Sequence, residues 1–327
     1  MSEPTPIRIA VVGLAGVGRT HMRLLDEMPD AALVGVCDVR TDLEAVKTTT
    51  APFFDDCARM LDEIAPQAVV LATPPATHLP LAKAASQRGI HVLVEKPMAE
   101  SVRSAEAMVE ACAEAGVVLM LGHKKRFVPA LARLRELLYG ELGPAQFLSY
   151  RYVHPGRSQK AWFWDEADGG GPLRENVVHA ADLLRWLVGE VVRIQGEADH
   201  FTFEDRAPQL NCAAMTLRFD TGAVASLSAG MVGTPALPNE ELFVATAAGI
   251  AEVRGRFDNP DTLHWALRGE RELRKEEFAG DPFRAELEHF LSCIRTGEAP
   301  LTSGEEGLRS LALCEWWKQD LNRRGER

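Results

Sequence analysis

The chain has 327 residues, of which 46% are hydrophobic and 25% are charged, and this composition is typical of a globular protein. Its formal net charge of −11 argues against nucleic acid or an anionic membrane surface as the main partner. No apolar run approaches the ~18 residues of a membrane span, and the N-terminus lacks the basic segment of a signal peptide, so we expect a cytoplasmic protein. The length predicts two domains rather than one.

Short apolar segments alternate with helical patterns over the first third of the chain. We expect strands at 7–13, 32–38, 52–54, 68–74, 91–96 and 117–122. Helices are expected at 17–28 and 101–115. Another helix is expected to begin at residue 55 or 56, and a further one to follow the fourth strand and end at residue 88. Continuous apolar strands that alternate with helices indicate a parallel sheet covered on both faces. We therefore predict a doubly wound α/β domain at residues 1–123.

The first strand is followed by VVGLAGVGRTH, which opens the first helix. Compared with the dinucleotide-binding pattern G-x-G-x-x-G, this segment has Gly13, Ala15 and Gly18 at the three pattern positions, and Gly16 and Val17 between the last two. Such a turn lets the backbone approach a pyrophosphate at the positive end of a helix. Ala15 adds a methyl group where the approach is closest, so a purely structural glycine turn is the alternative.

Asp38 ends the second strand at the position where a carboxylate binds the ribose hydroxyls of NAD. A carboxylate repels the 2′-phosphate of NADP, so this residue favours NAD. Arg40 lies two residues further on and can pair with such a phosphate, so NADP stays open.

The fourth and fifth strands end in motifs that we expect at the ligand-binding edge of the sheet. In ATPPATH, Thr73, Pro74 and His78 are expected to border the cofactor, although helix packing is an equal alternative for His78. In VEKP, Glu95 and Lys96 are assigned to the same cofactor site, and Lys96 is also a candidate for the chemistry.

The rest of the chain has a different pattern, in which strands follow one another without helices between them. We expect strands at 145–153, 191–199, 211–219, 223–230, 241–249 and 251–257. Helices are expected at 128–139, 175–187, 283–296 and 304–322. This pattern predicts an α+β domain at residues 124–327 with an open, mainly antiparallel sheet. The free face of such a sheet needs a cover, and a second copy of the chain is the simplest one, so we expect a homodimer or homotetramer.

Glu175, His179 and Asp182 fall at i, i+4 and i+7 within GGGPLRENVVHAADLLRW, so they share one helical face. Histidine titrates near neutral pH, and a carboxylate one helical turn away can orient it and support its charged form. The face is therefore a candidate for proton transfer, and a polar surface stripe is the alternative.

These motifs together resemble the glucose–fructose oxidoreductase/inositol dehydrogenase (Gfo/Idh/MocA) family. The resemblance covers nearly the whole chain and rests on the glycine turn with Gly18-x-x-His21, Asp38, ATPPATH, EKP, KKRFVP and GGGPLRENVVHAAD. It implies a Rossmann domain followed by an open-sheet domain, commonly in a homo-oligomer. It also implies hydride transfer between a nicotinamide and a hydroxyl-bearing carbon of a sugar, polyol or related compound.

The resemblance matches four side chains to positions of the family. Lys96 matches the family's lysine, which holds the substrate oxygen and relays a proton, and His179 matches the proposed general base. Glu175 stands where inositol-dehydrogenase-like members carry aspartate, so an inositol specificity is not carried over. Asp182 matches a family aspartate, for which anchoring of the helix is an alternative role.

Basic residues gather where the first domain passes into the second, in KKRFVP and the following strand and loop. Lys124 and Arg126 are expected to bind substrate, with a structural ion pair as the alternative for Arg126; Arg151, His154, Arg157 and Lys160 follow. This concentration suggests a carboxylate, phosphate or uronate on the substrate. Trp162 and Trp164 can stack on a sugar ring, and core packing is as reasonable for either of them.

The leading function is thus an NAD(P)-dependent dehydrogenase that acts on a CH–OH group. Two alternatives stay open: a non-catalytic nucleotide sensor, and an enzyme that cycles bound NAD during glycoside cleavage or epimerisation. No metal site is predicted, because the nine histidines are dispersed and the six cysteines form no CxxC pair.

Overall fold

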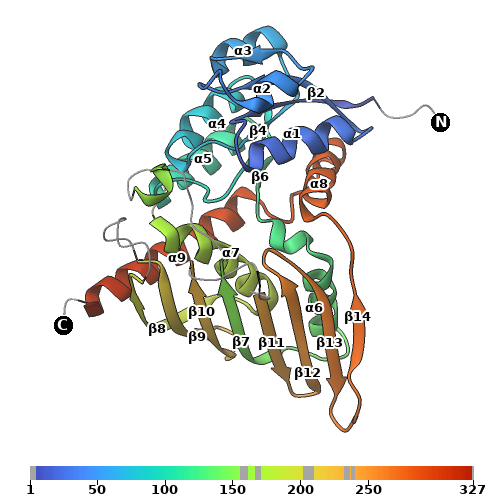
Figure 1. Cartoon of the computed structure of the whole chain (residues 1–327), viewed down its shortest axis with the longest axis vertical. Coiled ribbons are helices and arrows are strands. Elements are labelled where there is room, and N and C mark those ends of the chain that lie inside the picture. Colours follow the sequence, from blue (N-terminus) through green and yellow to red (C-terminus); the bar gives the residue numbers. More distant parts are fainter. Residues whose placement is uncertain are drawn as a thin grey trace. The chain divides into compact units, whose positions relative to one another are not determined.

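The computed structural model describes residues 5–154, 161–165, 171–201, 210–231, 236 and 240–325. The chain divides into two compact units, each described by itself below (Figure 1). Unit 1 consists of Met1–His123 and Phe283–Leu308, and unit 2 of Lys124–Pro282 and Arg309–Arg327. Among the described residues, no helix combines the length and the hydropathy that crossing a bilayer requires.

Unit 1 is built on a six-stranded parallel sheet in the order β3-β2-β1-β4-β5-β6. Its strands are β1 (Ile7–Val12), β2 (Ala31–Cys37), β3 (Phe53–Phe54), β4 (Ala68–Leu71), β5 (His91–Val94) and β6 (Leu119–Leu121). The order reverses direction between β1 and β4, and open α/β sheets bind dinucleotides at the carboxyl edge of this point. All four residues of β4 are fully buried, as a strand covered on both faces requires.

Helices connect these strands, and local capping explains where two of them begin. The helices are α1 (Val17–Glu27), α2 (Glu44–Thr48), α3 (Cys57–Ile64), the short η1 (Pro75–Thr77), α4 (His78–Ser86), α5 (Val102–Glu114) and α8 (Pro282–Thr296). Asp56 caps α3 by accepting the Arg59 N–H at 2.7 Å, and Ser101 caps α5 by accepting the Ser104 N–H at 3.1 Å. Each cap satisfies a backbone donor that has no partner within its helix.

Residues 283–308 pack with unit 1, whereas the sequence places them in the second domain. Strand β6 lies at the edge of the sheet and needs partners for its backbone groups. Thr302 supplies them: its carbonyl oxygen accepts the Leu121 N–H at 2.8 Å, and its Oγ1 donates to the Leu121 carbonyl at 2.8 Å. Arg295 on α8 pairs with Asp30 at 3.3 Å. The division between the two units falls after His123.

Unit 2 contains an eight-stranded sheet in the order β14-β13-β12-β11-β7-β10-β9-β8. Its strands are β7 (Ala145–Val153), β8 (Val191–Asp199), β9 (Cys212–Phe219), β10 (Val224–Gly230), β11 (Glu240–Thr246), β12 (Gly249–Arg256), β13 (Asn259–Leu267) and β14 (Arg274–Glu277). Neighbouring strands are antiparallel except β7 and β10, which are parallel. The expected open, mainly antiparallel sheet is thus confirmed, and β13 and β14 are additions that the sequence analysis missed.

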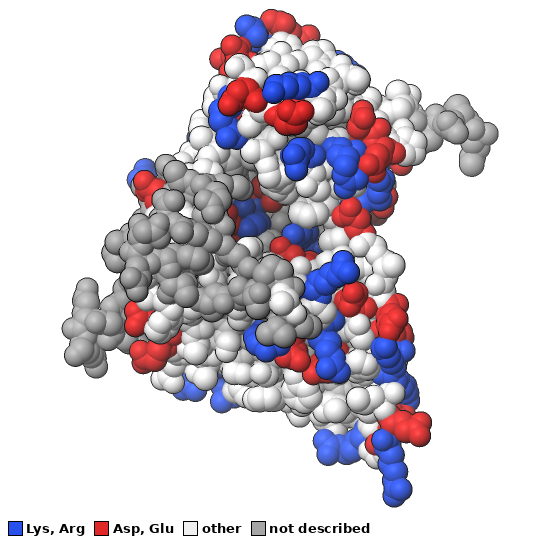
Figure 2. Space-filling view, viewed as in Figure 1, with Lys and Arg blue, Asp and Glu red and all other residues white. Residues whose placement is uncertain are grey.

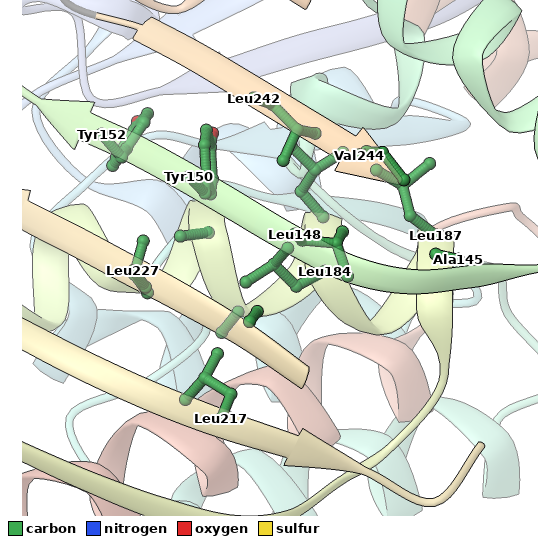
Figure 3. Close-up of a cluster of buried hydrophobic side chains, with 14 of the residues drawn as sticks. Ala145, Leu148, Tyr150, Tyr152, Leu184, Leu187, Leu217, Leu227, Leu242 and Val244 are labelled. Carbon is green, nitrogen blue, oxygen red and sulfur yellow. The ribbon is translucent and has the colours of Figure 1, made fainter. Parts of the chain in front are cut away.

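Helices cover one face of the unit 2 sheet. They are η2 (Lys124–Phe127), α6 (Pro129–Tyr139), η3 (Ala161–Trp164) and α7 (Gly171–Val188), and α9 (Gly304–Gly325) runs from unit 1 into unit 2. Helix α7 packs on β7, β9 and β10, and α6 packs on β12 and β13. Figure 3 shows the core between α7 and the sheet, where Leu184 and Leu187 meet Leu148, Leu227 and Leu242.

The alternation along β7 explains this layering. Leu148, Tyr150 and Tyr152 are buried under α7, whereas Phe147 on the opposite face is 45% exposed. Successive side chains of a strand point to opposite faces, so one face of the sheet is core and the other is surface. On the face of the molecule in Figure 2, acidic and basic side chains are interspersed, and no continuous basic patch is visible among the described residues.

Candidate active site

The glycine turn of unit 1 joins β1 to α1 and has the backbone of a dinucleotide-binding loop. Gly16 precedes α1 with φ 55° and ψ −116°, a conformation that side chains with a Cβ rarely adopt. A Cβ on Gly18 would lie 1.8 Å from the Gly13 carbonyl oxygen, so only glycine fits there. Ala15 is half-buried, and Val17 is the first residue of α1. The expected turn is therefore present, and Gly16, beside Ala15, has the positive φ that favours glycine.

Asp38 lies immediately after β2 and faces this turn. Its Oδ2 accepts the Leu14 N–H at 2.8 Å, and its Oδ1 accepts the Arg40 N–H at 2.9 Å. The Arg40 side chain is 55% exposed and lies 3.7 Å from the same carboxylate. A carboxylate has about four acceptor positions, so these two bonds leave capacity for ribose hydroxyls.

The end of β4 is held by His78, which is fully buried at the start of α4. Its Nε2 lies 2.8 Å from the Thr73 carbonyl oxygen and its Nδ1 lies 3.2 Å from the Met98 carbonyl oxygen. Burial lowers the pKa of His78, although the two carbonyl groups oppose this shift. Pro74 precedes η1, and the Thr77 hydroxyl donates to Thr73 Oγ1 at 2.7 Å. His78 thus braces Thr73, which corresponds to the helix-packing alternative considered for it.

Glu95 and Lys96 follow β5 at the same edge of the sheet. Glu95 is buried; its Oε1 lies 2.7 Å from His21 Nε2 on α1, and its Oε2 accepts the Lys96 N–H at 3.2 Å. Lys96 is half-buried. Glu286 on α8 joins this cluster, because one nitrogen or oxygen atom from each of His21, Glu95 and Glu286 lies within 4.8 Å of the others. No sequence spacing predicted this group, since its third member comes from the distant segment that returns to unit 1.

In unit 2, α7 carries the candidate base. Glu175 is 6% exposed, His179 4% and Asp182 0%, so this helical face is buried. The surface-stripe alternative is therefore wrong. The His179 ring lies edge-on to Tyr152 of β7, with ring centroids 6.3 Å apart. An imidazole held in this way beside a carboxylate one turn earlier has the composition of a proton-transfer site.

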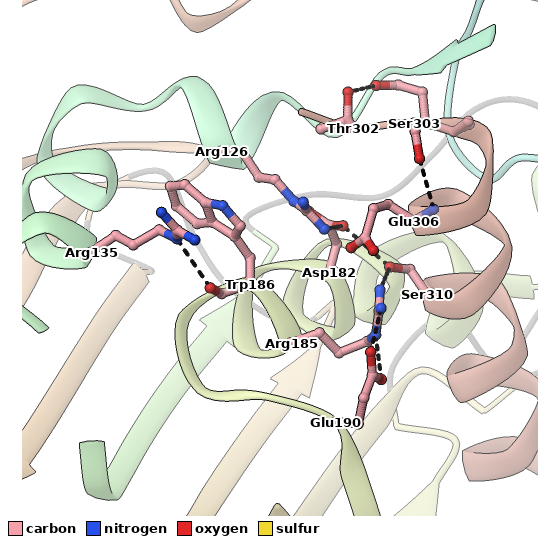
Figure 4. A network of polar contacts seen from close by, with 11 residues as sticks. Arg126, Arg135, Asp182, Arg185, Trp186, Glu190, Thr302, Ser303, Glu306 and Ser310 are labelled. Carbon is pink, nitrogen blue, oxygen red and sulfur yellow. Dashed lines mark hydrogen bonds and ion pairs between the residues drawn. The ribbon is translucent and has the colours of Figure 1, made fainter. Parts of the chain in front are cut away.

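Asp182 is fixed by a separate polar network (Figure 4). Arg126 donates to both of its oxygens, at 2.7 Å and 3.0 Å, and Ser310 donates to Oδ1 at 3.2 Å. Arg185 continues the network to Ser310 at 2.9 Å and to Glu190 at 2.7 Å. Asp182 therefore anchors α7, and Arg126 is its structural ion-pair partner, the alternative that the sequence left open.

Lys124 also has an internal partner. Its Nζ lies 3.0 Å from Asp258 Oδ2, and its side chain is 12% exposed. The adjacent Lys125 is fully buried and contacts both Glu240 and Asp258. Each of the three basic residues in KKRFVP is thus matched by a carboxylate within unit 2. The sequence left an ion pair open for Arg126 and did not predict the partners of Lys124 and Lys125.

The remaining candidates are spread over unit 2. Trp162 is half-buried against the cluster of Phe163, Trp164 and Met231, so Trp164 packs in a small core. Arg151 pairs with Glu241 at 3.0 Å on the outer face of the sheet. The His154 ring contacts the Phe257 ring. Arg157 and Lys160 lie outside the described residues.

Comparison with known proteins identifies the family of the chain. Residues 7–123 match the description "Oxidoreductase family, NAD-binding Rossmann fold", which defines an NAD-binding oxidoreductase, and residues 131–270 match the "GFO/IDH/MocA C-terminal domain". The chain belongs to the Gfo/Idh/MocA family of oxidoreductases, as the sequence resemblance indicated.

Three similar proteins illustrate the range of this family. Myo-inositol 2-dehydrogenase of Thermotoga maritima is 26% identical over 96% of both chains. The structure of the WlbA dehydrogenase from Bordetella pertussis with NADH and UDP-GlcNAcA has a TM-score of 0.82 and 27% identity, covering 98% of this chain and 97% of that one. The aldose-aldose oxidoreductase from Caulobacter crescentus, complexed with glycerol, has a TM-score of 0.85 and 25% identity over 99% of both chains.

Proposed function

We propose that the chain catalyses NAD-dependent hydride transfer from a hydroxyl-bearing carbon of a sugar, polyol or sugar acid. The observation that carries the proposal is the buried pair of Glu175 and His179 on α7, at the positions that match the family's proton-transfer motif. Burial keeps both groups in a low-dielectric environment, where hydrogen bonds and charges act more strongly than in water.

The residues of the chain handle the proton and the substrate oxygen. His179 accepts the hydroxyl proton, Glu175 orients the imidazole, and Lys96 stabilises the negative charge that develops on the oxygen. When bound, NAD⁺ supplies the hydride acceptor. The glycine turn fits the coenzyme's phosphates, because it leads directly into the N-terminus of α1, and the absence of a Cβ on Gly18 lets this helix pack closely on Gly13.

For the substrate, we propose a hydroxyl-rich molecule that the site accepts without needing a negative charge. The pairs Lys124–Asp258, Lys125–Glu240 and Arg126–Asp182 support this, because each cation is already compensated. The charges of Lys124 and Arg126 are therefore matched within unit 2 and give no support to an anionic substrate, while Lys124 retains N–H groups that can donate to a neutral oxygen.

The test is NADH formation by the purified chain with matched pairs of neutral sugars and their uronates, in parallel with calorimetric binding of NAD⁺. His179→Gln should lower kcat/KM by roughly 10²- to 10⁴-fold, the usual contribution of a general base, and leave NAD⁺ affinity unchanged. His264→Gln, a half-buried histidine on β13, serves as the control and should retain activity.

Other outcomes distinguish the alternatives. Tight NAD⁺ binding without turnover of any substrate would favour a nucleotide sensor. Conversion of substrate without release of NADH would favour cycling of bound coenzyme. The likeness to an aldose-aldose oxidoreductase is the reason to measure this outcome.

We also propose that the outer face of the unit 2 sheet pairs with a second copy of the chain. Phe147 is 45% exposed, its ring centroid lies 6.5 Å from that of Phe243, and Ile250 is 40% exposed. Analytical ultracentrifugation should show a dimer or tetramer that Phe147→Glu weakens. Tyr139→Glu, at a 71% exposed residue of α6, is the matched control, and a monomeric wild-type chain would refute the proposal.

A further inference from the structure

Asp258 lies in the short turn between β12 and β13 of unit 2. Its φ of 71° is in the left-handed region, which Asp and Asn adopt more readily than other residues with a Cβ. Its backbone N–H donates to Glu240 Oε2 at 2.8 Å, and Glu240 also accepts the Tyr150 hydroxyl at 3.0 Å. The contacts with Glu240 therefore hold the Asp258 backbone in place.

Three donors converge on the Asp258 carboxylate. The Tyr152 hydroxyl donates at 2.9 Å, Lys124 Nζ lies at 3.0 Å and Lys125 Nζ at 3.4 Å. Burial would raise the pKa of Asp258, but the two lysines and His179 outweigh it and hold the pKa well below its usual range. Burial, together with the nearby carboxylates, raises the pKa of Tyr152, so that residue stays a neutral donor.

Tyr152 connects this carboxylate to the candidate base. Its hydroxyl binds Asp258 and its ring packs edge-on to His179, with centroids 6.3 Å apart. Electrostatic stabilisation between two groups is reciprocal. Because a charged His179 ring stabilises the Asp258 carboxylate, the carboxylate stabilises the charged ring by the same amount.

We propose that Asp258 is a positioning residue for His179: it fixes the Tyr152 ring against the imidazole, and its charge favours the imidazolium that forms when His179 takes up the substrate proton. The second half of this inference rests on the proposed function of His179. The geometry of the carboxylate, the phenol and the imidazole does not depend on it.

Other charged groups of unit 2 come from α7 itself and from neighbouring elements. Glu175 and Asp182 come from α7 itself; Lys124, Lys125 and Arg126 come from η2, Glu240 comes from β11, and η3 is followed by the exposed Asp165. Glu315 of α9 is paired with Arg174 of α7. Arg126 offsets Asp182, and Lys125 offsets Glu240. Among these described groups, Asp258, which pairs with Lys124, is the carboxylate that Tyr152 connects to His179.

The first experiment is a proton NMR titration of the histidine rings in the full chain, with the His179 signals assigned by their loss in His179→Gln. Asp258→Asn keeps the shape of the side chain but removes its charge, so the His179 midpoint should fall by about one pH unit, a tenfold change in its proton affinity. Lys124→Met removes the opposing charge and should move the same midpoint upwards. Glu272→Gln, at an exposed position, is the charge-matched control and should leave it unchanged.

Shifts of opposite sign are the decisive result, because a purely structural disturbance would not reverse direction with the sign of the lost charge. An unchanged His179 midpoint in both variants would overturn the inference. If Asp258→Asn does not fold, Lys124→Met alone decides, and a downward or absent shift there would also overturn it.

The titration needs no substrate, so its outcome is separate from that of the activity assay. A chain that shows both opposite shifts but oxidises no sugar would retain the Asp258–His179 coupling and contradict only the proposed reaction.

Discussion

Asp38 is the residue on which the coenzyme preference depends at the smallest scale. Its carboxylate binds the backbone of the glycine turn through Leu14 and that of the following loop through Arg40. The same group therefore shapes the turn and faces the place expected for the ribose.

Asp38→Asn should weaken NAD⁺ binding by roughly 10- to 100-fold, since a hydrogen bond to a charged group contributes about 1.5–3 kcal/mol. It should also narrow the difference between NAD⁺ and NADP⁺, because the repulsion of the 2′-phosphate is lost. Calorimetric titration with both coenzymes checks this, with Asp42→Asn as a nearby exposed control. Tighter binding of NADP⁺ than of NAD⁺ by the unmodified chain would contradict the assignment.

Cys57 is the second residue with a distinct expected behaviour. The hydrogen bond with Cys37 lowers the pKa of Cys57 and raises that of Cys37. Burial raises the pKa of Cys112 to about 11, and the pKa values of Cys212, Cys293 and Cys314 are raised by burial as well.

Because the thiolate is the reactive form, iodoacetamide near neutral pH should modify Cys57 before the other five cysteines. Mass spectrometry of tryptic peptides over time measures the order. Cys57→Ser should remove the fastest phase, and earlier labelling of Cys112 would show that accessibility, rather than thiolate formation, governs the reaction.

At the scale of elements, a buried ion pair holds α7 in addition to the packing of its apolar face. Asp182 is completely buried, and its carboxylate accepts hydrogen bonds from Nε and Nη2 of Arg126 and from the Ser310 hydroxyl (Figure 4). The cost of removing one member of such a pair comes mainly from the buried charge that remains.

Asp182→Ala should therefore lower the free energy of unfolding by about 3–5 kcal/mol. Asp55→Ala breaks the pair of Asp55 with Arg59, in which both side chains are more than half exposed (61% and 54%), so its loss should cost about 1 kcal/mol or less. Urea denaturation of both variants compares them directly. Equal losses would mean that the Arg126–Asp182 pair does not anchor the helix.

For the whole molecule, the network around Asp258 limits stability at both ends of the pH range. The pKa of Asp258 is held well below its usual range, despite burial, by Lys124 and Lys125. The contribution of Asp258 to stability is complete above its unfolded-state pKa of about 3.9 and is lost as the pH falls through the lower folded-state pKa.

At the alkaline end, burial, reinforced by Glu240 and Asp258, raises the pKa values of Tyr150 and Tyr152 well above their usual value. Their contribution is complete below about pH 10 and is lost as the pH rises further.

Thermal unfolding measured from acid to alkaline pH should therefore show a plateau between these limits. Asp258→Asn should flatten the acid limb and also weaken the alkaline limb, because the Asp258 charge helps to raise the pKa of Tyr152. Tyr152→Phe should flatten the alkaline limb. An acid limb that is unchanged in Asp258→Asn would assign the acid sensitivity to other carboxylates.

The sequence by itself determined those parts of the molecule that depend on local chemistry. Apolar strands alternating with helices predicted the parallel sheet, and the glycine spacing predicted a turn whose Gly13 and Gly18 leave no room for a Cβ. Glu175, His179 and Asp182 were placed on one helical face because helical periodicity acts over a few residues.

Only the tertiary structure decided which distant groups meet. Asp258 reaches Lys124 and Tyr152 across 134 and 106 residues of sequence, so no short spacing records these contacts. Residues 283–308 join unit 1 because the edge of β6 needs backbone partners, a requirement that becomes visible once the sheet is formed. Charge compensation in KKRFVP was likewise decided by tertiary packing, because a buried cation is stable only where the fold brings a carboxylate to it.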